Sequence, residues 1–169
     1  NVMSPMARAL LCSTIATRAA EGHPGSKHQK GVKYLERIEA IVVELAKKLF
    51  KAKYAECRAL SGSMANMIAF NALTNYRDKI MSLSVPCGGH ISYRKFGVAG
   101  HRGLIIKDIP FDGEEMNIDI EKLEERAKKV QPKLLVVGAS LILFPYPLEK
   151  IRKIADEVDA KILYDGAHV

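Results

Sequence analysis

The sequence predicts an α/β protein with three αβα layers, in which helices cover both faces of a mostly parallel central sheet. Short apolar stretches alternate with helical patterns, and LLVVGAS at residues 134–140 is apolar almost throughout, as a strand buried on both faces is. The composition is 48% apolar and 27% charged, which is ordinary for a globular protein. At 169 residues, the chain is long enough to bury a sizeable core.

The first third of the chain predicts two helices around a loop. Ser4-Pro5 opens a helix expected at residues 4–20, because apolar residues then recur at helical spacing. Residues 21–31 form a loop, since proline and three glycines interrupt a polar run. A long amphipathic helix is expected at residues 34–52.

The middle third predicts strands that end in small or polar turns. A short strand is expected at residues 55–60, a turn at 61–63 and a helix over 64–74. Residues 79–85 predict a further strand, and PCGGH at 86–90 predicts a tight loop.

The last third continues the alternation. We expect a strand at residues 104–111, followed by a charged helix that Asn117 or Asp119 caps and that runs to Val130. After the apolar stretch LLVVGAS comes a helix at 147–158 and a final strand at 161–164.

Charge and cysteine content narrow the class of protein. The net charge of +7 suits anionic ligands, but the basic residues are scattered without interleaved aromatics, so nucleic-acid binding is not expected. Cys12, Cys57 and Cys87 have no metal-like spacing and indicate reduced thiols in the cytoplasm. No apolar run approaches about 18 residues, so no membrane span is expected.

Four small or ionisable motifs follow the expected strands, where α/β sheets bind ligands. They are SGS at 61–63, CGGH at 87–90, GAS at 138–140 and DGAH at 165–168. The first is an anion cradle or a plain serine cap. His90 is a surface-loop histidine, a ring that stacks on a planar ligand, or an acid–base group. Asp165 ends its strand in an Asx turn or holds a cation, a metal or a protonated ring nitrogen.

The loop at residues 21–31 carries a further candidate site. Glu21 lies close to His23 and His28, which leaves a solvated carboxylate or a metal site open. No regular helical spacing of ligands supports the metal, so none is expected.

Five motifs in order resemble the fold type I pyridoxal-phosphate enzymes, and within them the serine hydroxymethyltransferase family. NVMSP is similar to the end of that family's SEN-x-x-SP, and AEGHPGSKHQKG to its AEGYPGKRYYGG loop. SGSMAN resembles SGSQAN, GGHIS resembles GGHLT, and DGAHV resembles D-x-AH. The resemblance runs along almost the whole chain and implies part of that fold's large, cofactor-binding domain.

The resemblance implies a role in holding pyridoxal 5'-phosphate for each strand-end motif. Asp165 would pair with the pyridinium nitrogen, while His90 and Ala167 would pack on opposite faces of the ring. Ser140 would reach the ring hydroxyl, and His168 would support the same side. The phosphate would be bound by Ser61, Gly62 and Ser63.

The implied reaction moves the hydroxymethyl carbon of serine to a reduced pterin, tetrahydrofolate or tetrahydromethanopterin, and leaves glycine. Glu21 would act as acid–base group across the interface of a homodimer. The pterin pocket would be lined by Val85, Gly89 and Ile91. Two loop tyrosines of the family correspond to Ala19 and Gln29 here, which indicates a divergent branch.

The resemblance also implies a division into residues 1–52, with the helices and the dimer and active-site loop, and residues 53–169, part of the cofactor domain. The Schiff-base lysine would lie beyond Val169, so we expect residues 1–169 alone to be inactive. Two alternatives stay open beside the hydroxymethyltransferase: another fold type I aldolase or lyase acting on an amino acid, and a phosphate-cofactor-binding module without chemistry.

Overall fold

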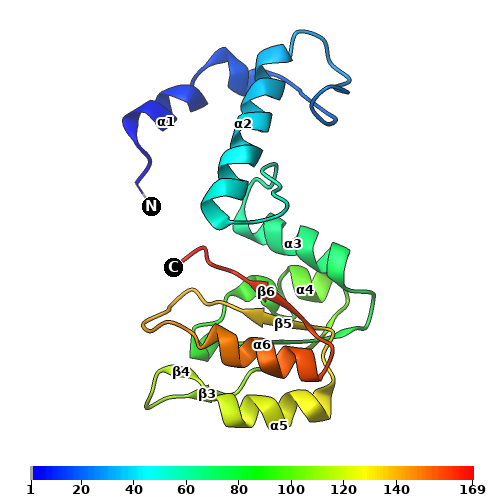
Figure 1. Cartoon of the computed structure of the whole chain (residues 1–169), viewed down its shortest axis with the longest axis vertical. Coiled ribbons are helices and arrows are strands. Elements are labelled where there is room, and N and C mark those ends of the chain that lie inside the picture. Colours follow the sequence, from blue (N-terminus) through cyan, green and yellow to red (C-terminus); the bar gives the residue numbers. More distant parts are fainter. Residues whose placement is uncertain (1) are drawn as a thin grey trace. The chain divides into compact units, whose positions relative to one another are not determined.

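The computed structural model describes residues 2–169, so Asn1 of the NVMSP segment lies outside the described residues. The chain divides into two compact units, Asn1–Arg58 and Ala59–Val169, each of which is described by itself (Figure 1). The division expected after residue 52 concerns folding domains and stays a prediction.

The first unit begins with a shorter helix than expected. Helix α1 spans Pro5–Leu11, and a 3-10 turn follows at Thr14–Thr17, so the continuous helix expected at residues 4–20 is wrong. The hydroxyl of Ser13 donates to the Leu10 carbonyl and that of Thr17 to the Thr14 carbonyl. Such side chains compete with the backbone for helical carbonyls, which favours the break.

Helix α2, Lys33–Phe50, holds the preceding loop in place. The Lys27 side chain is 2% exposed, and its ammonium donates to the Ala20 carbonyl and to Glu39 of α2, at 2.7 Å each. One turn earlier, the carboxylate of Glu36 accepts from the Gly25 amide at 2.9 Å. The expected loop at residues 21–31 is therefore confirmed and is tied to α2 at two points.

The second unit is built on a four-stranded parallel sheet, as the sequence predicts. Its strands are β1 (Lys79–Ser82), β2 (Ile105–Asp108), β5 (Leu134–Val137) and β6 (Lys161–Tyr164). The spatial order is β2-β1-β5-β6, and all three neighbouring pairs are parallel. From β1 the chain moves outward to β2 on one side of the sheet, and from β5 it moves outward to β6 on the other side. The direction of the connections therefore reverses between β1 and β5.

Helices cover both faces of this sheet, which confirms the three-layer arrangement for the second unit (Figure 1). The helices are α3 (Gly62–Leu73), α4 (Val98–His101), α5 (Ile120–Val130) and α6 (Leu148–Glu157). Successive strand residues enter different cores because side chains alternate across a sheet. Leu134 and Val136 pack with Phe70 of α3, whereas Leu135 and Val137 pack with Leu123 of α5.

The structure corrects two local expectations and decides between the two caps expected for one helix. Residues 55–60 form no strand, because no neighbouring strand pairs with them and Glu56 and Arg58 instead bond to each other. The stretch expected as one strand at 104–111 ends at Asp108. A small antiparallel hairpin follows, β3 (Phe111–Asp112) with β4 (Asn117–Ile118), and Asp119 rather than Asn117 caps α5.

Among residues 2–169, no helix is long and apolar enough to cross a membrane. The same residues show no cluster of three or more His, Cys, Asp or Glu side chains that would hold a metal ion.

Candidate functional site

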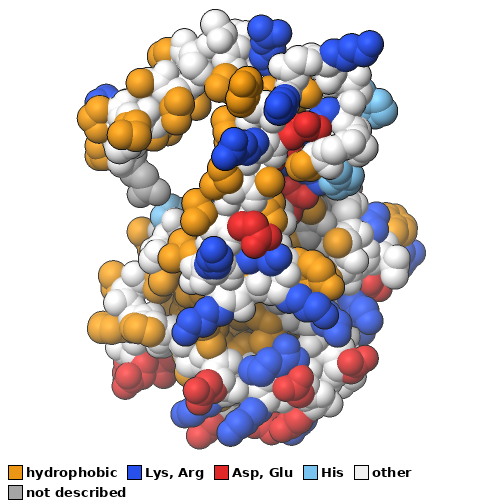
Figure 2. Space-filling view, turned by 45° about the horizontal axis from the view of Figure 1, so that its top comes forward, with side chains coloured by type: hydrophobic (Ala, Val, Ile, Leu, Met, Phe, Trp, Pro, Cys, Tyr) orange, Lys and Arg blue, Asp and Glu red, His pale blue; other side chains and the backbone are white. Residues whose placement is uncertain are grey.

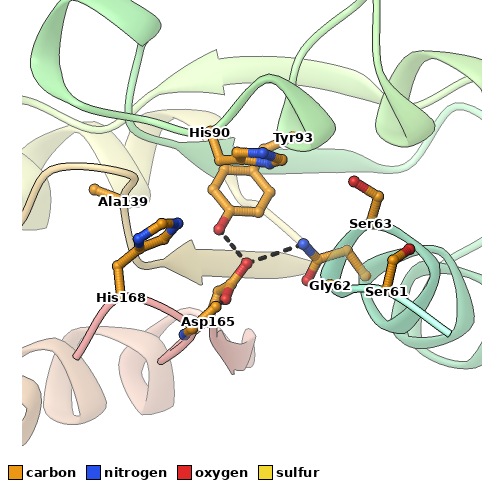
Figure 3. A pocket seen from close by; sticks show the side chains of 10 residues that line it. Ser61, Gly62, Ser63, His90, Tyr93, Ala139, Asp165 and His168 are labelled. Atoms are coloured by element: carbon orange, nitrogen blue, oxygen red, sulfur yellow. Dashed lines mark hydrogen bonds between the residues drawn. The ribbon is translucent and has the colours of Figure 1, made fainter. Parts of the chain in front are cut away.

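A cavity of about 240 Å³ opens at the carboxyl edge of the sheet in the second unit. It lies at the ends of β1, β5 and β6, where the topology reverses, which is where open α/β sheets bind ligands. Figure 3 shows the side chains that line it. The lining residues are Ser61, Gly62, Ser63, Asn66, His90, Tyr93, Ala139, Asp165, Ala167 and His168.

Asp165 is held by three hydrogen-bond donors. Its Oδ2 accepts from the hydroxyl of Tyr93 at 2.5 Å and from Nδ2 of Asn66 at 3.0 Å (Figure 3). Its Oδ1 accepts from the backbone amide of Ala167 at 3.2 Å. This last contact closes the expected Asx-type turn, and the carboxylate lines the cavity as well. The binding role expected for Asp165 stays a prediction.

These contacts keep Asp165 ionised and Tyr93 neutral. Burial opposes the charge on Asp165, but the hydrogen bonds from Tyr93 and Asn66 outweigh burial, so the pKa of Asp165 lies below its usual value. Burial and the bond to the carboxylate raise the pKa of Tyr93 well above its usual value. The cavity therefore contains a fixed negative charge beside a tyrosine that keeps its proton.

His90 is fixed in one orientation by the residue two positions on. Its Nδ1 accepts from the backbone amide of Ser92 at 3.2 Å and lies 2.7 Å from the Ser92 hydroxyl. An amide can only donate, so Nδ1 carries no proton in this arrangement and the proton of the neutral ring lies on Nε2. Tyr93 supports the same ring edge-on, with the ring centroids 5.9 Å apart.

The start of α3 presents backbone donors to the cavity. Ser61 caps the helix, because its Oγ accepts from the Met64 amide at 3.2 Å, and the Ala65 amide bonds to the Ser61 carbonyl. Within the described part of the chain, the amides of Gly62 and Ser63 have no acceptor. The expected serine cap is therefore present, and it leaves two amides free at a helix N-terminus, a position that favours an anion.

Gly138 lets the ends of β5 and β6 approach each other. Its φ is +144°, and a Cβ there would lie 2.4 Å from the carbonyl oxygen of Asp165. The amide of Asp165 also donates to the Val137 carbonyl at 2.8 Å. A side chain at position 138 would displace the carboxylate from the cavity wall.

Arg94 anchors the loop that carries His90 to the sheet. Its guanidinium donates to Oγ of Ser82 at 3.2 Å, to the Leu83 carbonyl at 3.3 Å and to Asp108 at 2.6 Å. These contacts join the ends of β1 and β2 to the loop, so the position of His90 depends on the sheet.

The structure does not bring every expected site residue to this cavity. Ser140 is not among the lining residues, and its backbone amide donates to the Gly88 carbonyl at 2.7 Å. Gly89 is buried, whereas Val85 and Ile91 flank the His90 loop with about half of their surface exposed. None of these three lines the cavity. The roles expected for these residues stay predictions.

Glu21 belongs to the first unit, and its role also stays a prediction. Its amide donates to Oε1 of Gln29 at 2.8 Å, and Nε2 of Gln29 donates back to its carboxylate at 3.3 Å. Gln29, one of the departures from the family motif, therefore orients the Glu21 side chain.

Sequence reasoning missed three cavity residues, Asn66, Tyr93 and Ala139. Asn66 lies one helical turn after Gly62 and is 4% exposed, so helical spacing alone aligns it with the start of α3. Tyr93 is 1% exposed and ends a 3-10 turn, Ile91–Tyr93, that the sequence did not predict. The signal that could have indicated Asn66 was a polar side chain at a helix position that helical spacing places on the buried side.

Comparison with known proteins shows the family of this chain. The family model described as serine hydroxymethyltransferase matches residues 1–169. The chain belongs to the serine hydroxymethyltransferase family. The resemblance seen in the five sequence motifs is thereby confirmed.

Several archaeal members of the serine hydroxymethyltransferase family align with the whole chain. The protein named serine hydroxymethyltransferase from Archaeoglobus fulgidus is 45% identical over 169 residues. Those from Methanocella arvoryzae and Methanothermobacter marburgensis are 44% and 43% identical. The alignments cover 100% of this chain and 39–40% of each relative, so the chain spans about two fifths of their length.

Proposed function

We propose that the cavity binds pyridoxal 5'-phosphate and serves a serine hydroxymethyltransferase that passes the serine hydroxymethyl carbon to a reduced pterin and leaves glycine. One observation carries the proposal: an ionised, hydrogen-bonded carboxylate and a helix N-terminus with free amides line the same cavity. A phosphorylated pyridinium needs these two groups, one for its ring nitrogen and one for its phosphate.

The chain's own donors and acceptors fit this cofactor. An ionised carboxylate has about four lone-pair positions. In the described part of the chain, Tyr93, Asn66 and the Ala167 amide occupy three of those of Asp165, which leaves one for a ligand's N–H. The amides of Gly62 and Ser63 supply donors that an anion would satisfy.

When bound, the cofactor would supply an electron sink for charge that develops at the amino-acid Cα. Asp165 would hold a proton on the ring nitrogen, because its own pKa is low and it stays negative. His90 would stack on one face of the ring and Ala167 would pack on the other. The hydroxyl of Ser61 accepts from Met64 and keeps its own proton to donate to the phosphate.

Further roles follow from the family's motifs rather than from contacts with the cavity. Glu21, oriented by Gln29, would move a proton near the serine hydroxymethyl group. Val85, Gly89 and Ile91 would line the pterin pocket beside His90. Ser140 and His168 would support the side of the ring that carries the hydroxyl.

We also propose that the protein acts as a homodimer. The first unit exposes many large apolar side chains on α1 and α2, as Figure 2 shows. On α2, Ile38, Ile41, Val42, Leu45 and Leu49 recur at helical spacing, and each is at least 41% exposed. A contiguous apolar face of this kind marks an interaction site, and a second copy would cover it.

A pterin-dependent assay of the intact protein tests the proposed reaction. Wild type should convert serine and a reduced pterin to glycine in a pyridoxal-phosphate-dependent manner. Asp165→Ala should lower kcat by at least about 100-fold, as the loss of a preorganised charge does. Asp156→Ala, on the exposed face of α6, is the control and should keep wild-type activity. Cleavage of another hydroxy amino acid without need for a pterin would favour an aldolase instead.

No lysine lines the cavity among residues 2–169. We therefore expect a polypeptide of residues 1–169 alone to exchange no hydroxymethyl group, because no lysine attaches the cofactor there. Robust serine–glycine exchange by that polypeptide would contradict this expectation.

A further inference from the structure

Five cavity and cavity-edge residues form one continuous hydrogen-bonded chain. Tyr93 donates to Oδ2 of Asp165, and Asn66 donates to the same oxygen. The amide nitrogen of Asn66 also lies 3.1 Å from the Ser92 hydroxyl, which in turn lies 2.7 Å from Nδ1 of His90. Two groups expected on the cofactor, Asp165 and His90, are thus linked through residues to which no role is assigned.

We propose that Tyr93 and Asn66 are positioning residues that act through Asp165, fixing its carboxylate for the nitrogen of a pyridinium ligand. This inference rests on the proposed function, because it names residues that tune the same site.

The geometry on Oδ2 supports this assignment. Two donors on one oxygen fix the rotation of the carboxylate and leave the remaining lone pair on Oδ1 for a ligand. Hydrogen bonds to a charged group are shorter and stronger than neutral ones. The Tyr93 contact, at 2.5 Å, lies at the short end of the range for a hydroxyl and a carboxylate.

Burial makes both donors costly to lose. Tyr93 is 1% exposed, Asn66 is 4% exposed and Ser92 is 2% exposed, so water does not readily replace any of them. The Asn66 amide gives both of its hydrogens within the chain, one to Ser92 and one to Asp165. Changing Asn66 therefore loosens the His90 side and the Asp165 side together, whereas removing the Tyr93 hydroxyl acts on Asp165 alone.

A matched pair of ligands tests the proposal in the intact protein. Pyridoxal phosphate carries the ring nitrogen, and its 1-deaza analogue carries C–H in that place. Wild type should bind pyridoxal phosphate more tightly. Tyr93→Phe should weaken pyridoxal-phosphate binding by about ten-fold and leave the affinity for the deaza analogue within about two-fold. Asn66→Ala should weaken pyridoxal-phosphate binding more than binding of the deaza analogue, because the loosened His90 affects both ligands and the loosened Asp165 only one. Tyr146→Phe is the control, since Tyr146 is a buried tyrosine outside the cavity.

A thermodynamic cycle shows whether the effect passes through Asp165. In an Asp165→Asn background, Tyr93→Phe should no longer change the affinity for pyridoxal phosphate. An undiminished effect in that background would overturn the proposal, as would equal losses for both ligands.

Titration of the cofactor-free protein gives a second readout that needs no activity. Carbon-13 NMR of the Asp165 carboxyl should show its pKa raised in Tyr93→Phe and in Asn66→Ala, and unchanged in Tyr146→Phe. An Asp165 pKa unchanged in both cavity variants would overturn the proposal. The failure of wild type to distinguish the two ligands would instead overturn the proposed function, while this titration would still decide the role of Tyr93 and Asn66.

Discussion

The hydrogen bonds around Asp165 hold its carboxylate in place at the cavity. It follows β6 at the cavity edge, and three donors from three parts of the chain converge on it: Tyr93, Asn66 and the Ala167 amide. The sequence indicates the carboxylate but not these donors, because the Asn66 and Tyr93 side chains reach it only through the tertiary fold. The residue type was predictable and its low pKa was not.

The pH dependence of stability follows from that low pKa. Since the native pKa of Asp165 lies below the ordinary value of 3.8, the carboxylate stabilises the fold above that value. This stabilisation is lost as the pH falls from about 4 through the native pKa. We expect the urea midpoint of the second unit to drop less between pH 6 and pH 3 in Asp165→Asn than in wild type. Asp156→Asn, on an exposed face, should drop as wild type does, and identical drops in all three would contradict the account.

Among the helices and strands, the fully buried strand was the easiest to predict from the sequence. The apolar stretch at 134–140 contains β5, which is buried throughout, because burial on both faces leaves a continuous apolar signal. The strand expected at 161–164 is β6, which pairs with β5 at the edge of the sheet. Residues 55–60 alternate Glu56 and Arg58 with small or apolar residues and have no pairing partner, so they form no strand. Strand formation depends on a neighbour that a single sequence does not display.

Ser61 caps helix α3 and also lies at the proposed phosphate site. Ser61→Ala should destabilise the second unit by about 1 kcal/mol and weaken pyridoxal-phosphate binding, because one side chain serves both the helix and the anion. Asp119→Ala removes the cap of α5, where Oδ1 accepts from the Lys122 amide at 3.0 Å, and lies outside the cavity. It should lower stability but leave binding unchanged. Denaturant titration and ligand titration of both variants check the prediction, and equal binding losses would contradict it.

The close approach of the ends of β5 and β6 at Gly138 predicts the effect of a larger residue there. Gly138→Ala should destabilise the second unit by about 1–3 kcal/mol and weaken cofactor binding, because its Cβ would collide with Asp165 and its φ is +144°. Gly113→Ala is the matched control, since no atom lies within 4 Å of its added Cβ. Thermal unfolding of both variants measures the difference. A Gly138→Ala protein as stable as Gly113→Ala would contradict the close approach.

For the whole molecule, the layered α/β architecture followed from the order of apolar and amphipathic segments. The composition of the cavity followed from the parallel sheet, because its strand ends meet at one edge. The motifs after β1 and β6 contribute residues to the cavity lining, whereas after β5 the lining residue is Ala139 and not Ser140. Which of two adjacent residues faces a cavity depends on backbone angles that spacing does not reveal.

The apolar face of α2 gives a prediction for the assembly of the whole molecule. Changing both Leu45 and Leu49 to Glu should raise the dimer dissociation constant at least about 30-fold, because two carboxylates would lose their hydration inside an apolar interface. Lys48→Glu, an exposed charge change on the same helix, should have a much smaller effect. Sedimentation velocity over a range of concentrations measures both, and a double variant that dimerises like wild type would contradict the proposed interface.

A crystal structure of the intact protein with pyridoxal phosphate tests the central claim most directly. The account predicts the ring nitrogen within about 3.2 Å of the Asp165 carboxylate and the phosphate against the amides of Gly62 and Ser63. His90 should stack on the ring. A cofactor bound elsewhere, or one whose ring nitrogen makes no contact with Asp165, would contradict it.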